Sequence, residues 1–445
     1  YIREMEICSD LRIKELVKNI HRLLLGVEKG SDGNSSIVKI NSDNLSKYGD
    51  VCFLTKLETW RKVFPDNFES VSNSGNILEH YLTRNGIEFE YEDVTDKAFR
   101  NIIQASRNWC LKIEKCILQN ERVCLFLDRR YTLAKTVETI VARDVGYGEF
   151  EAKNKTFCFN VVYDKESELT NLRLRLIKSV ADNIIKTHGY KVSDNIIVDK
   201  YDITTKSKTG SNDQSKVILC GVAKNSTTKT KETNITEIQY FDEKLAELFD
   251  ATEHKLISPN GQTKDKNSGL KRIAEAAVAM EFLAVKPSRA ITIASGLDSA
   301  NAKGKFCLNQ SCCARLLSYI IRREYLQFLI VYQNLERLLI CMCFFFSQFQ
   351  EEWELAYNFL LGYPETIETC VRLEGGLEIC PQYICSFLSR FSNKFSAYYR
   401  RVRILTEGRD HLLPTMMARL YLLKAIQIVI RNALRLLNID PVSRM

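Results

Sequence analysis

Cationic and aromatic side chains, the types that bind RNA, are concentrated in the last 60 positions of this 445-residue chain. Residues 386–445 hold 11 Lys and Arg against 3 Asp and Glu, whereas the remaining 385 residues hold 52 cationic and 52 acidic side chains. The formal net charge of +8 is therefore confined to one end of the chain. A basic surface confined to one domain is typical of a protein that binds nucleic acid.

Two predicted helices would carry these side chains. On a helix over 384–405 the apolar residues share one face, with Tyr398 and Tyr399 at its border, and a helix over 413–437 has a basic stripe beside its apolar face. The cations that would contact phosphates are Arg390, Lys394, Arg401, Arg403, Lys424, Arg431 and Arg435. The tyrosines would stack on unpaired bases. The pattern also fits two core-edge aromatics beside a solvated basic face.

The last ten residues and a shorter segment upstream carry a family resemblance. The tail Leu436-Leu-Asn-Ile-Asp-Pro-Val-Ser-Arg-Met445 and the run Ala314-Arg315-Leu316 resemble the C-terminal anticodon-binding (DALR) domain of arginyl-tRNA synthetases. The resemblance implies an all-helical tRNA-binding domain, with Arg315 among its tRNA contacts. It also implies that the thioether and free carboxylate of Met445 lie close to a base of the anticodon. The alternative for Met445 is a frayed chain end.

The motifs with which a synthetase activates its amino acid are absent from the sequence. None of the five histidines lies three residues from another, so no His-x-Gly-His-type motif exists to stabilise the adenylate phosphates. The segment Lys206-Ser207-Lys208 resembles the second synthetase motif, but it lies in a loop rich in Lys and Ser, where chance explains it. The sequence therefore predicts no catalytic residues and no cofactor.

A tRNA-binding end without synthetase motifs is similar to a catalytically inactive family of arginyl-tRNA synthetase-like proteins. Further segments agree, including 216–221 and 398–405. The resemblance implies a non-enzymatic adaptor that binds arginine tRNA, and neither DNA nor a membrane. Its implied protein partner is the methyltransferase that forms 3-methylcytidine in the anticodon loop. A divergent arginyl-tRNA synthetase and a structural subunit of a synthetase assembly are the alternatives.

Strands alternate with helices through the middle of the chain. Apolar runs at 122–127, 156–162 and 216–222 alternate with helical patterns at 131–142 and 169–185. This alternation predicts a parallel, doubly wound sheet, and a further helical pattern covers the region 96–119. By resemblance, this sheet would be a degenerate synthetase-like (Rossmann-type) α/β domain, followed by the all-α anticodon-binding (DALR) bundle.

Composition changes divide the chain into three expected domains. Residues 1–120 would form an N-terminal helical or mixed region, 121–303 the α/β scaffold and 304–445 the helical domain. A helical pattern over 13–26 opens the first of these. The boundary near 303 is placed where the apolar pattern becomes helical throughout.

The 15 cysteines form neither a Cys-x-x-Cys pair nor a group with histidines at metal-ligand spacing. We therefore expect buried, reduced thiols without a metal site, which favours the cytoplasm. The longest apolar run, 338–346, has nine residues, whereas a membrane span needs about 20. The sequence thus predicts no transmembrane helix.

Overall fold

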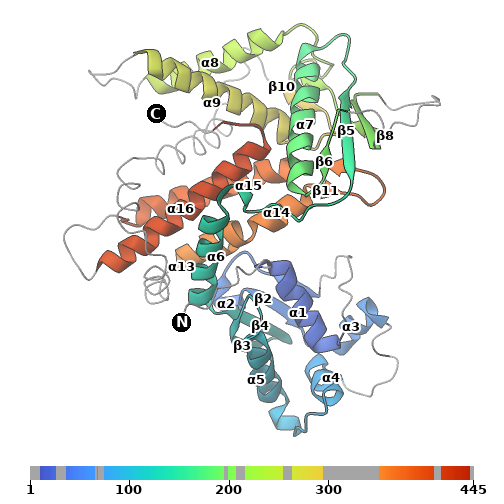
Figure 1. Ribbon diagram of the computed structural model, residues 1–445, viewed down its shortest axis with the longest axis vertical. Helices are drawn as coiled ribbons and strands as arrows, with labels where there is room; N and C mark the ends of the chain where they lie inside the picture. The colour runs from blue at the N-terminus through green and yellow to red at the C-terminus, as the bar shows by residue number, and fades with distance from the viewer. Residues whose placement is uncertain are drawn as a thin grey trace. The chain divides into compact units, whose positions relative to one another are not determined.

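The computed structural model describes residues 11–26, 37–65, 68, 75–194, 199–206, 216–253, 263–293, 350–404 and 412–440 (Figure 1). The chain forms two compact units, each assembled from segments that are distant in sequence. Unit 1 comprises Tyr1–Ala142, Asn334–Glu365 and Leu405–Arg419. Unit 2 comprises Arg143–Gln333, Thr366–Ile404 and Leu420–Met445.

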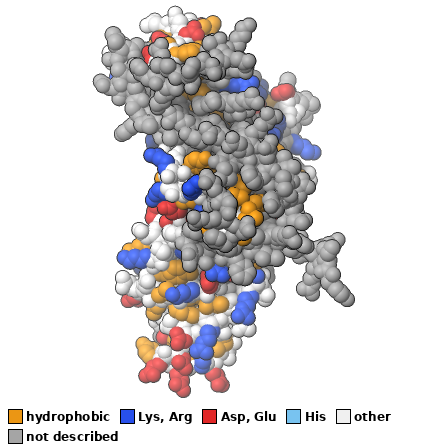
Figure 2. All heavy atoms as spheres, turned by 90° about the vertical axis from the view of Figure 1, so that its left-hand side faces the viewer, with side chains coloured by type: hydrophobic (Ala, Val, Ile, Leu, Met, Phe, Trp, Pro, Cys, Tyr) orange, Lys and Arg blue, Asp and Glu red, His pale blue; other side chains and the backbone are white. Residues whose placement is uncertain are grey.

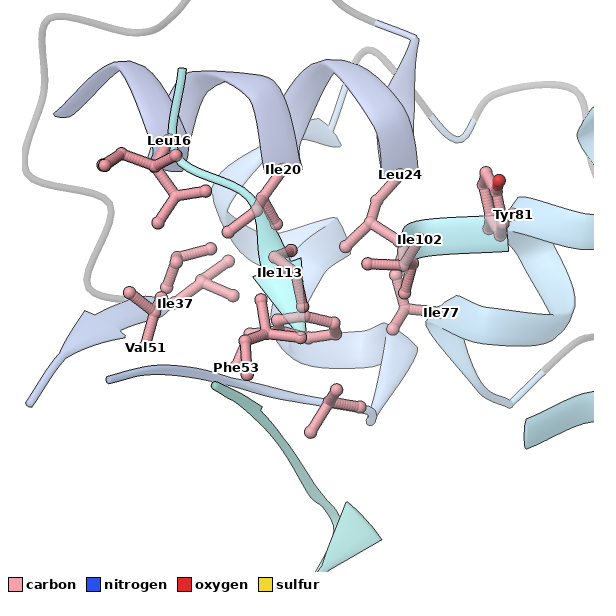
Figure 3. Packing of buried hydrophobic residues seen from close by; sticks show 14 of the residues in the cluster. Leu16, Ile20, Leu24, Ile37, Val51, Phe53, Ile77, Tyr81, Ile102 and Ile113 are labelled. Atoms are coloured by element: carbon pink, nitrogen blue, oxygen red, sulfur yellow. The ribbon is translucent and has the colours of Figure 1, made fainter. Parts of the chain in front are cut away.

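A four-stranded antiparallel sheet, ordered β1-β2-β4-β3, is the centre of unit 1. Its strands are β1 (Val38–Ile40), β2 (Val51–Leu54), β3 (Ile113–Gln119) and β4 (Arg122–Leu127). The helices of this unit include α1 (Ile13–Leu25), α2 (Leu45–Tyr48), α3 (Leu57–Val63), α4 (Ile77–Arg84), η2 (Tyr91–Asp93) and α5 (Val94–Ser106). In α1, Leu16, Ile20 and Leu24 recur every four residues, so they share one face and point towards Val51 and Phe53 of the sheet (Figure 3).

A segment from much later in the chain completes this core. It consists of α13 (Gln350–Leu355) and the π-helical turn η6 (Ala356–Leu361). The Trp353 indole N–H donates to Asp50 Oδ1 at 2.8 Å, and the Tyr357 hydroxyl donates to the Asp50 carbonyl oxygen at 2.7 Å. The backbone N–H of Leu127 donates to Asp50 Oδ2 at 2.8 Å. The buried Asp50 therefore joins the start of β2, the end of β4 and α13.

The helix expected over 96–119 is wrong in its second half. α5 ends at Ser106, and residues 113–119 form β3, which pairs with β4 through a tight hairpin. Asn120 and Glu121 in the turn have φ of 46° and 60°, the left-handed values that a two-residue hairpin turn requires. The 122–127 strand is confirmed, but it lies in this antiparallel sheet and not in a parallel one.

Unit 2 contains the parallel sheet that the sequence predicts. The order is β6-β5-β7-β8, and each neighbouring pair is parallel. The strands are β5 (Thr156–Val161), β6 (Lys191–Val192), β7 (Asp199–Thr204) and β8 (Lys216–Leu219), and a second parallel pair joins β9 (Ala223–Asn225) to β10 (Ile291–Ile293). The helices that follow or flank these strands are α7 (Glu168–Thr187), α8 (Glu237–Glu253) and α9 (Thr263–Leu283).

The C-terminal part of the described chain is mainly helical, and one short β-hairpin departs from the all-helical domain that the sequence predicts. Helix α6 (Arg129–Arg143) and the turn η3 (Asp144–Gly146) connect the antiparallel sheet to the parallel sheet along the chain. The elements that follow η6 are α14 (Tyr363–Thr369), the short hairpin of β11 (Val371–Arg372) and β12 (Glu378–Ile379), α15 (Gln382–Arg401) and α16 (Leu413–Leu436). The fold class, an α/β region followed by helices, is therefore confirmed. α15 ends four residues before the predicted end at 405.

The expected domain boundaries stay predictions. The boundary between residues 120 and 121 falls in the turn between β3 and β4, and the boundary at 303–304 lies outside the described residues. Among described residues, α16 is long and apolar enough to span a membrane, but 67% of its most apolar window is buried in the protein. A buried core helix meets the same criterion, so this is weak evidence for a span.

Eight of the described cysteines are free, namely Cys52, Cys116, Cys124, Cys158, Cys220, Cys370, Cys380 and Cys385. Seven of these are buried and Cys116 is half-buried. Cys110 is disulfide-bonded, which differs from the expectation that all thiols are reduced. Within the described ranges, no cluster of three or more His, Cys, Asp or Glu side chains could hold a metal ion.

Candidate nucleic-acid interface

α15 separates its apolar and basic side chains as the helical period predicts. The buried face is lined by Ile384, Leu388, Phe391, Phe395 and Tyr398. Arg390 and Arg401 are exposed and Lys394 is half-buried, and these three side chains lie within about 40° of one another around the helix axis. Arg403, just after the helix, is also exposed. The predicted basic stripe on α15 therefore exists as a surface feature.

The two tyrosines of α15 differ in burial. Tyr398 is 1% exposed, and its ring lies 6.3 Å from that of Phe395, so Tyr398 belongs to the core. This corrects its assignment as a stacking residue, because a ring held in the core offers no face to a base. Tyr399 is half-buried, with its ring 5.8 Å from that of Phe395. A stacking role for Tyr399 stays a prediction.

On α16 the side chains of the predicted basic stripe differ in exposure and in their contacts within the protein. Lys424 is half-buried and Arg435 is exposed. Arg431 forms an ion pair with Asp144, and Nδ2 of Asn432 donates to the Asp144 carbonyl oxygen at 2.8 Å. Its guanidinium binds a carboxylate, so Arg431 also fixes α16 to η3. A phosphate contact of Arg431 stays a prediction. Arg315 and Met445 lie outside the described residues.

The carboxyl edge of the parallel sheet is where a doubly wound fold binds its ligand. There Lys231 Nζ lies 2.6 Å from Asp164 Oδ1 and 2.8 Å from Glu166 Oε2. Burial acts to raise the pKa of the Asp164 carboxyl, but Lys231 and the backbone N–H groups of Glu166 and Ser167 outweigh it and hold the pKa below its usual value. Asp164 and Glu166 at this edge are thus paired with a lysine of the chain itself.

Polar side chains at the start of α7 are also satisfied internally. Ser167 caps the helix by accepting from the Thr170 backbone N–H at 3.2 Å, and Thr170 Oγ1 accepts from the Ala223 backbone N–H at 3.2 Å. The Asn171 side chain accepts from the Asp164 backbone N–H and donates to the Asp164 carbonyl oxygen. These groups hold the loop after β5 against the helix and against the start of β9.

The described histidines His21, His80 and His188 are all buried. His188 lies at the far end of α7, where its ring stacks on Phe150 at 4.8 Å and Nε2 lies 2.9 Å from the Ile367 carbonyl oxygen. Burial lowers the pKa of His21 and His80, so these two rings favour the neutral form. None of the three is placed at the carboxyl edge of the parallel sheet, which agrees with the missing His pair.

The sequence interpretation missed Arg173, a fully buried cation of α7. Its guanidinium donates to the carbonyl oxygens of Gly221, Val285, Lys286 and Arg289, at distances of 2.6–3.3 Å. Burial lowers the pKa of Arg173. The signal available in the sequence was an Arg on the apolar face of a predicted helix, but its carbonyl partners come from loops that no periodicity identifies.

Residues 334–445 match the DALR anticodon binding domain. The chain is also similar to mouse and zebrafish proteins named DALR anticodon-binding domain-containing protein 3, with 27% identity over 234 and 248 residues. Each alignment covers 52% of this chain but only 43% and 42% of those relatives, so the matches span less than half of their length. An arginine–tRNA ligase from Nitrosospira multiformis is 31% identical over 86 residues, which are 19% of this chain and 13% of the ligase.

Solved structures show the class of fold. Arginyl-tRNA synthetase from Thermus thermophilus superposes with a TM-score of 0.59 and 10% identity, covering 97% of this chain and 100% of the synthetase. The Plasmodium falciparum enzyme superposes with a TM-score of 0.57 and 10% identity, covering 97% and 99%. The chain therefore has an arginyl-tRNA synthetase-like fold with a DALR domain at its C-terminal end.

Proposed function

We propose that this protein is a non-catalytic tRNA-binding adaptor that selects arginine tRNAs and brings to them the methyltransferase that forms 3-methylcytidine in the anticodon loop. The observation that carries the proposal is the DALR match over 334–445, on the part of the chain that holds the excess positive charge. α15 exposes Arg390 and Arg401 on one stripe there, three helical turns apart, a geometry suited to two separate phosphates of the tRNA backbone.

The side chains at the carboxyl edge of the parallel sheet support the absence of catalysis. A synthetase places groups there that bind ATP and the adenylate. In this chain Asp164, Glu166 and Lys231 bind one another, and the polar groups at the start of α7 are bonded to neighbouring backbone. We infer that the synthetase-like unit acts as a scaffold. We also propose that the adaptor is cytoplasmic, where mature tRNA is available for modification.

The proposal is tested in cells that lack the protein. We expect 3-methylcytidine to fall on arginine tRNAs and to stay unchanged on other tRNAs, because the adaptor selects the substrate while another protein holds the chemistry. Sequencing of tRNA with detection of 3-methylcytidine measures both groups at once. Unchanged 3-methylcytidine on arginine tRNAs, at normal methyltransferase levels, would contradict the adaptor role and leave tRNA binding to be judged separately.

A further inference from the structure

Two cysteines stand directly opposite each other on neighbouring strands of the sheet in unit 1. Cys52 of β2 is the partner of Cys124 of β4. The Thr55 backbone N–H donates to the Glu121 carbonyl oxygen at 2.8 Å, and hydrogen-bonded pairs alternate along an antiparallel ladder, so the two cysteines form a non-hydrogen-bonded pair. In such pairs the opposing Cβ atoms approach to about 4.5 Å, close to the separation that a disulfide requires.

Both cysteine side chains point away from the hydrophobic core of unit 1. Their strand neighbours Val51, Phe53 and Val123 belong to that core, and successive side chains of a strand alternate between its two faces. The other face bears a cavity of about 430 Å³ that both cysteines line. The two thiols are free, and they are only 4% and 3% exposed. The cavity therefore gives a small reagent access to thiols that are otherwise shielded.

The charges around the cavity suit a reactive sulfur. Its described lining includes the cations Lys39 and Arg122 and the carboxylate Asp43, whereas acidic side chains of unit 1 gather at the lower tip of the view in Figure 2. Burial raises the pKa of the Cys124 thiol, the charge of Cys52 raises it further, and Arg122 acts against both. The two thiols therefore lie within electrostatic reach of each other.

The Cys52 thiol also helps to hold one wall of the cavity. It donates to Asn41 Oδ1 at 3.8 Å, and Asn41 Nδ2 donates to the carbonyl oxygens of Tyr48 and Gly49, each at 3.0 Å. Asn41 thus ties together the connection between β1 and β2, from which several of the lining residues come. A disulfide has no hydrogen to donate, so oxidation of Cys52 removes the donor to Asn41 Oδ1.

We propose that Cys52 and Cys124 form a reversible disulfide, with a peroxide that enters the cavity as the oxidant. In the first step one thiolate attacks a peroxide oxygen and the O–O bond breaks. A sulfenic acid forms, and the released hydroxide takes up the thiol proton to give water. In the second step the other sulfur attacks the sulfenic sulfur, the S–O bond breaks, and the hydroxide leaves with the second thiol proton as water.

The electrons balance, because the two thiols together lose the electron pair that reduces one hydrogen peroxide to two waters. A small thiol reverses the reaction by exchange at the disulfide. The oxidation state of the pair then controls how firmly Asn41 holds the connection between β1 and β2. This inference is independent of the proposed adaptor function, since it rests on the sheet and the cavity of unit 1 alone.

The test uses the full chain, first reduced and then treated with hydrogen peroxide. The protein is unfolded in N-ethylmaleimide, which alkylates the remaining thiols, and is then digested with trypsin. Cleavage after Lys and Arg releases Cys52 in the peptide 48–56 and Cys124 in the peptide 123–129, each with a single cysteine. Mass spectrometry therefore assigns a linked peptide without ambiguity, and re-formation of the Cys110 disulfide does not interfere.

Cys370 and Cys380 provide a matched control within the same protein. They are also directly opposite each other, where the β11–β12 pairing continues, and both are free. The Cys380 backbone N–H donates to the Cys370 carbonyl oxygen at 2.8 Å, so this is a hydrogen-bonded pair with its side chains farther apart. The two are 0% and 1% exposed.

We expect the linked peptide to appear, and alkylation of Cys52 and Cys124 to fall together by at least about half and to recover with dithiothreitol. Alkylation of Cys370 and Cys380 should fall by less than about one tenth. Cys52→Ala should give no linked peptide. Hydrogen exchange of the backbone amides in 41–50 should be faster in the oxidised protein than in the reduced protein.

Each opposite result overturns a defined part of the proposal. Full alkylation of Cys52 and Cys124 after peroxide, or a linked peptide that forms only after cooperative unfolding is lost, overturns the disulfide. Oxidation that dithiothreitol does not reverse overturns its reversibility. Equal oxidation of Cys370 and Cys380 overturns the role of the cavity and of the strand geometry. Unchanged hydrogen exchange in 41–50 overturns the effect on the connection between β1 and β2.

Discussion

At the scale of single residues, Tyr398 and Tyr399 are neighbours in sequence with different surroundings. Tyr398→Ala should lower the free energy of unfolding by about 3–5 kcal/mol, because a fully buried aromatic ring is replaced by a cavity. Tyr399→Ala should cost less stability and should reduce the preference for arginine tRNA over other tRNAs. Denaturant unfolding and competition binding measure the two effects. Similar unfolding midpoints for both variants would contradict the difference in burial.

Arg401 and Arg431 give a second contrast between surface and fold. Arg401→Ala should weaken binding of all tRNAs by similar factors and lower the slope of log affinity against log salt by about one, because a phosphate contact carries no sequence information. Arg431→Ala should in addition lower the free energy of unfolding, because it leaves Asp144 without its ion pair and removes a tie between α16 and η3. Denaturant unfolding of both variants, beside a salt titration of tRNA affinity, checks this, and equal losses of stability would contradict the division.

The stripes of α15 and α16 were predictable because helical periodicity is local. The partner of Arg431 was not, since Asp144 lies 287 positions earlier in the chain. The burial of Tyr398 was also not predictable from local sequence. The helical period places residues 398 and 399 near the edge of the apolar face, but neighbouring elements determine which of the two rings enters the core. Arg315 and Met445, outside the described residues, remain predictions.

At the scale of elements, periodicity alone did not separate helix from strand over 107–119. The apolar and charged residues of 113–119 alternate only in part, so helical spacing fitted them as well. The decisive signal was the turn at Asn120 and Glu121, which adopts left-handed φ values and pairs β3 with β4. Asn tolerates this conformation better than most residues, so Asn120 was the clue available in the sequence.

The Asp50 cluster gives a prediction at this scale. Burial raises the pKa of Asp50 to about 6, although the Leu127 backbone N–H, Arg129 and Trp353 act to lower it. The native carboxyl then holds its proton to a higher pH than the unfolded one, so the contribution of Asp50 to stability decreases as pH rises from about 4 to 6. Asp50→Asn has no proton to lose, so its stability deficit relative to wild type should narrow over this range.

Denaturant unfolding of wild type and Asp50→Asn at pH 4.5, 6 and 7 measures this gap directly. Comparing the two proteins removes the opposite contribution of His21 and His80, whose lowered pKa values decrease stability as pH falls below about 6.5 in both proteins. Trp353→Phe, which removes the indole donor to Asp50 Oδ1, serves as a variant with the carboxyl intact. A deficit that widens with rising pH would contradict a raised pKa for Asp50.

At the scale of the whole molecule, the succession of strands and helices predicted the class of fold. It did not predict how the chain segments are divided between the two compact units. β5 and β8 were predicted from the alternation of strand and helix and lie in the parallel sheet, whereas β7, which pairs with both, was not predicted. By contrast, Trp353 and Tyr357 lie about 300 residues from Asp50, to which they bind, and no local pattern indicates that α13 completes the core of unit 1. Long-range assignments of this kind depend on packing, which periodicity does not encode.

The absence of catalysis is also a prediction about the whole chain. Purified protein with arginine, ATP and arginine tRNA should give no arginine-dependent pyrophosphate exchange above background. The physical reason is that Asp164, Glu166 and Lys231 bind one another at the edge of the sheet, while His188 is buried at the far end of α7. A bacterial arginyl-tRNA synthetase serves as the positive control. The opposite result would be exchange above background that is lost in a Lys231→Ala variant which still melts cooperatively. That result would show a working active site at this edge, and the chain would then be an active arginyl-tRNA synthetase.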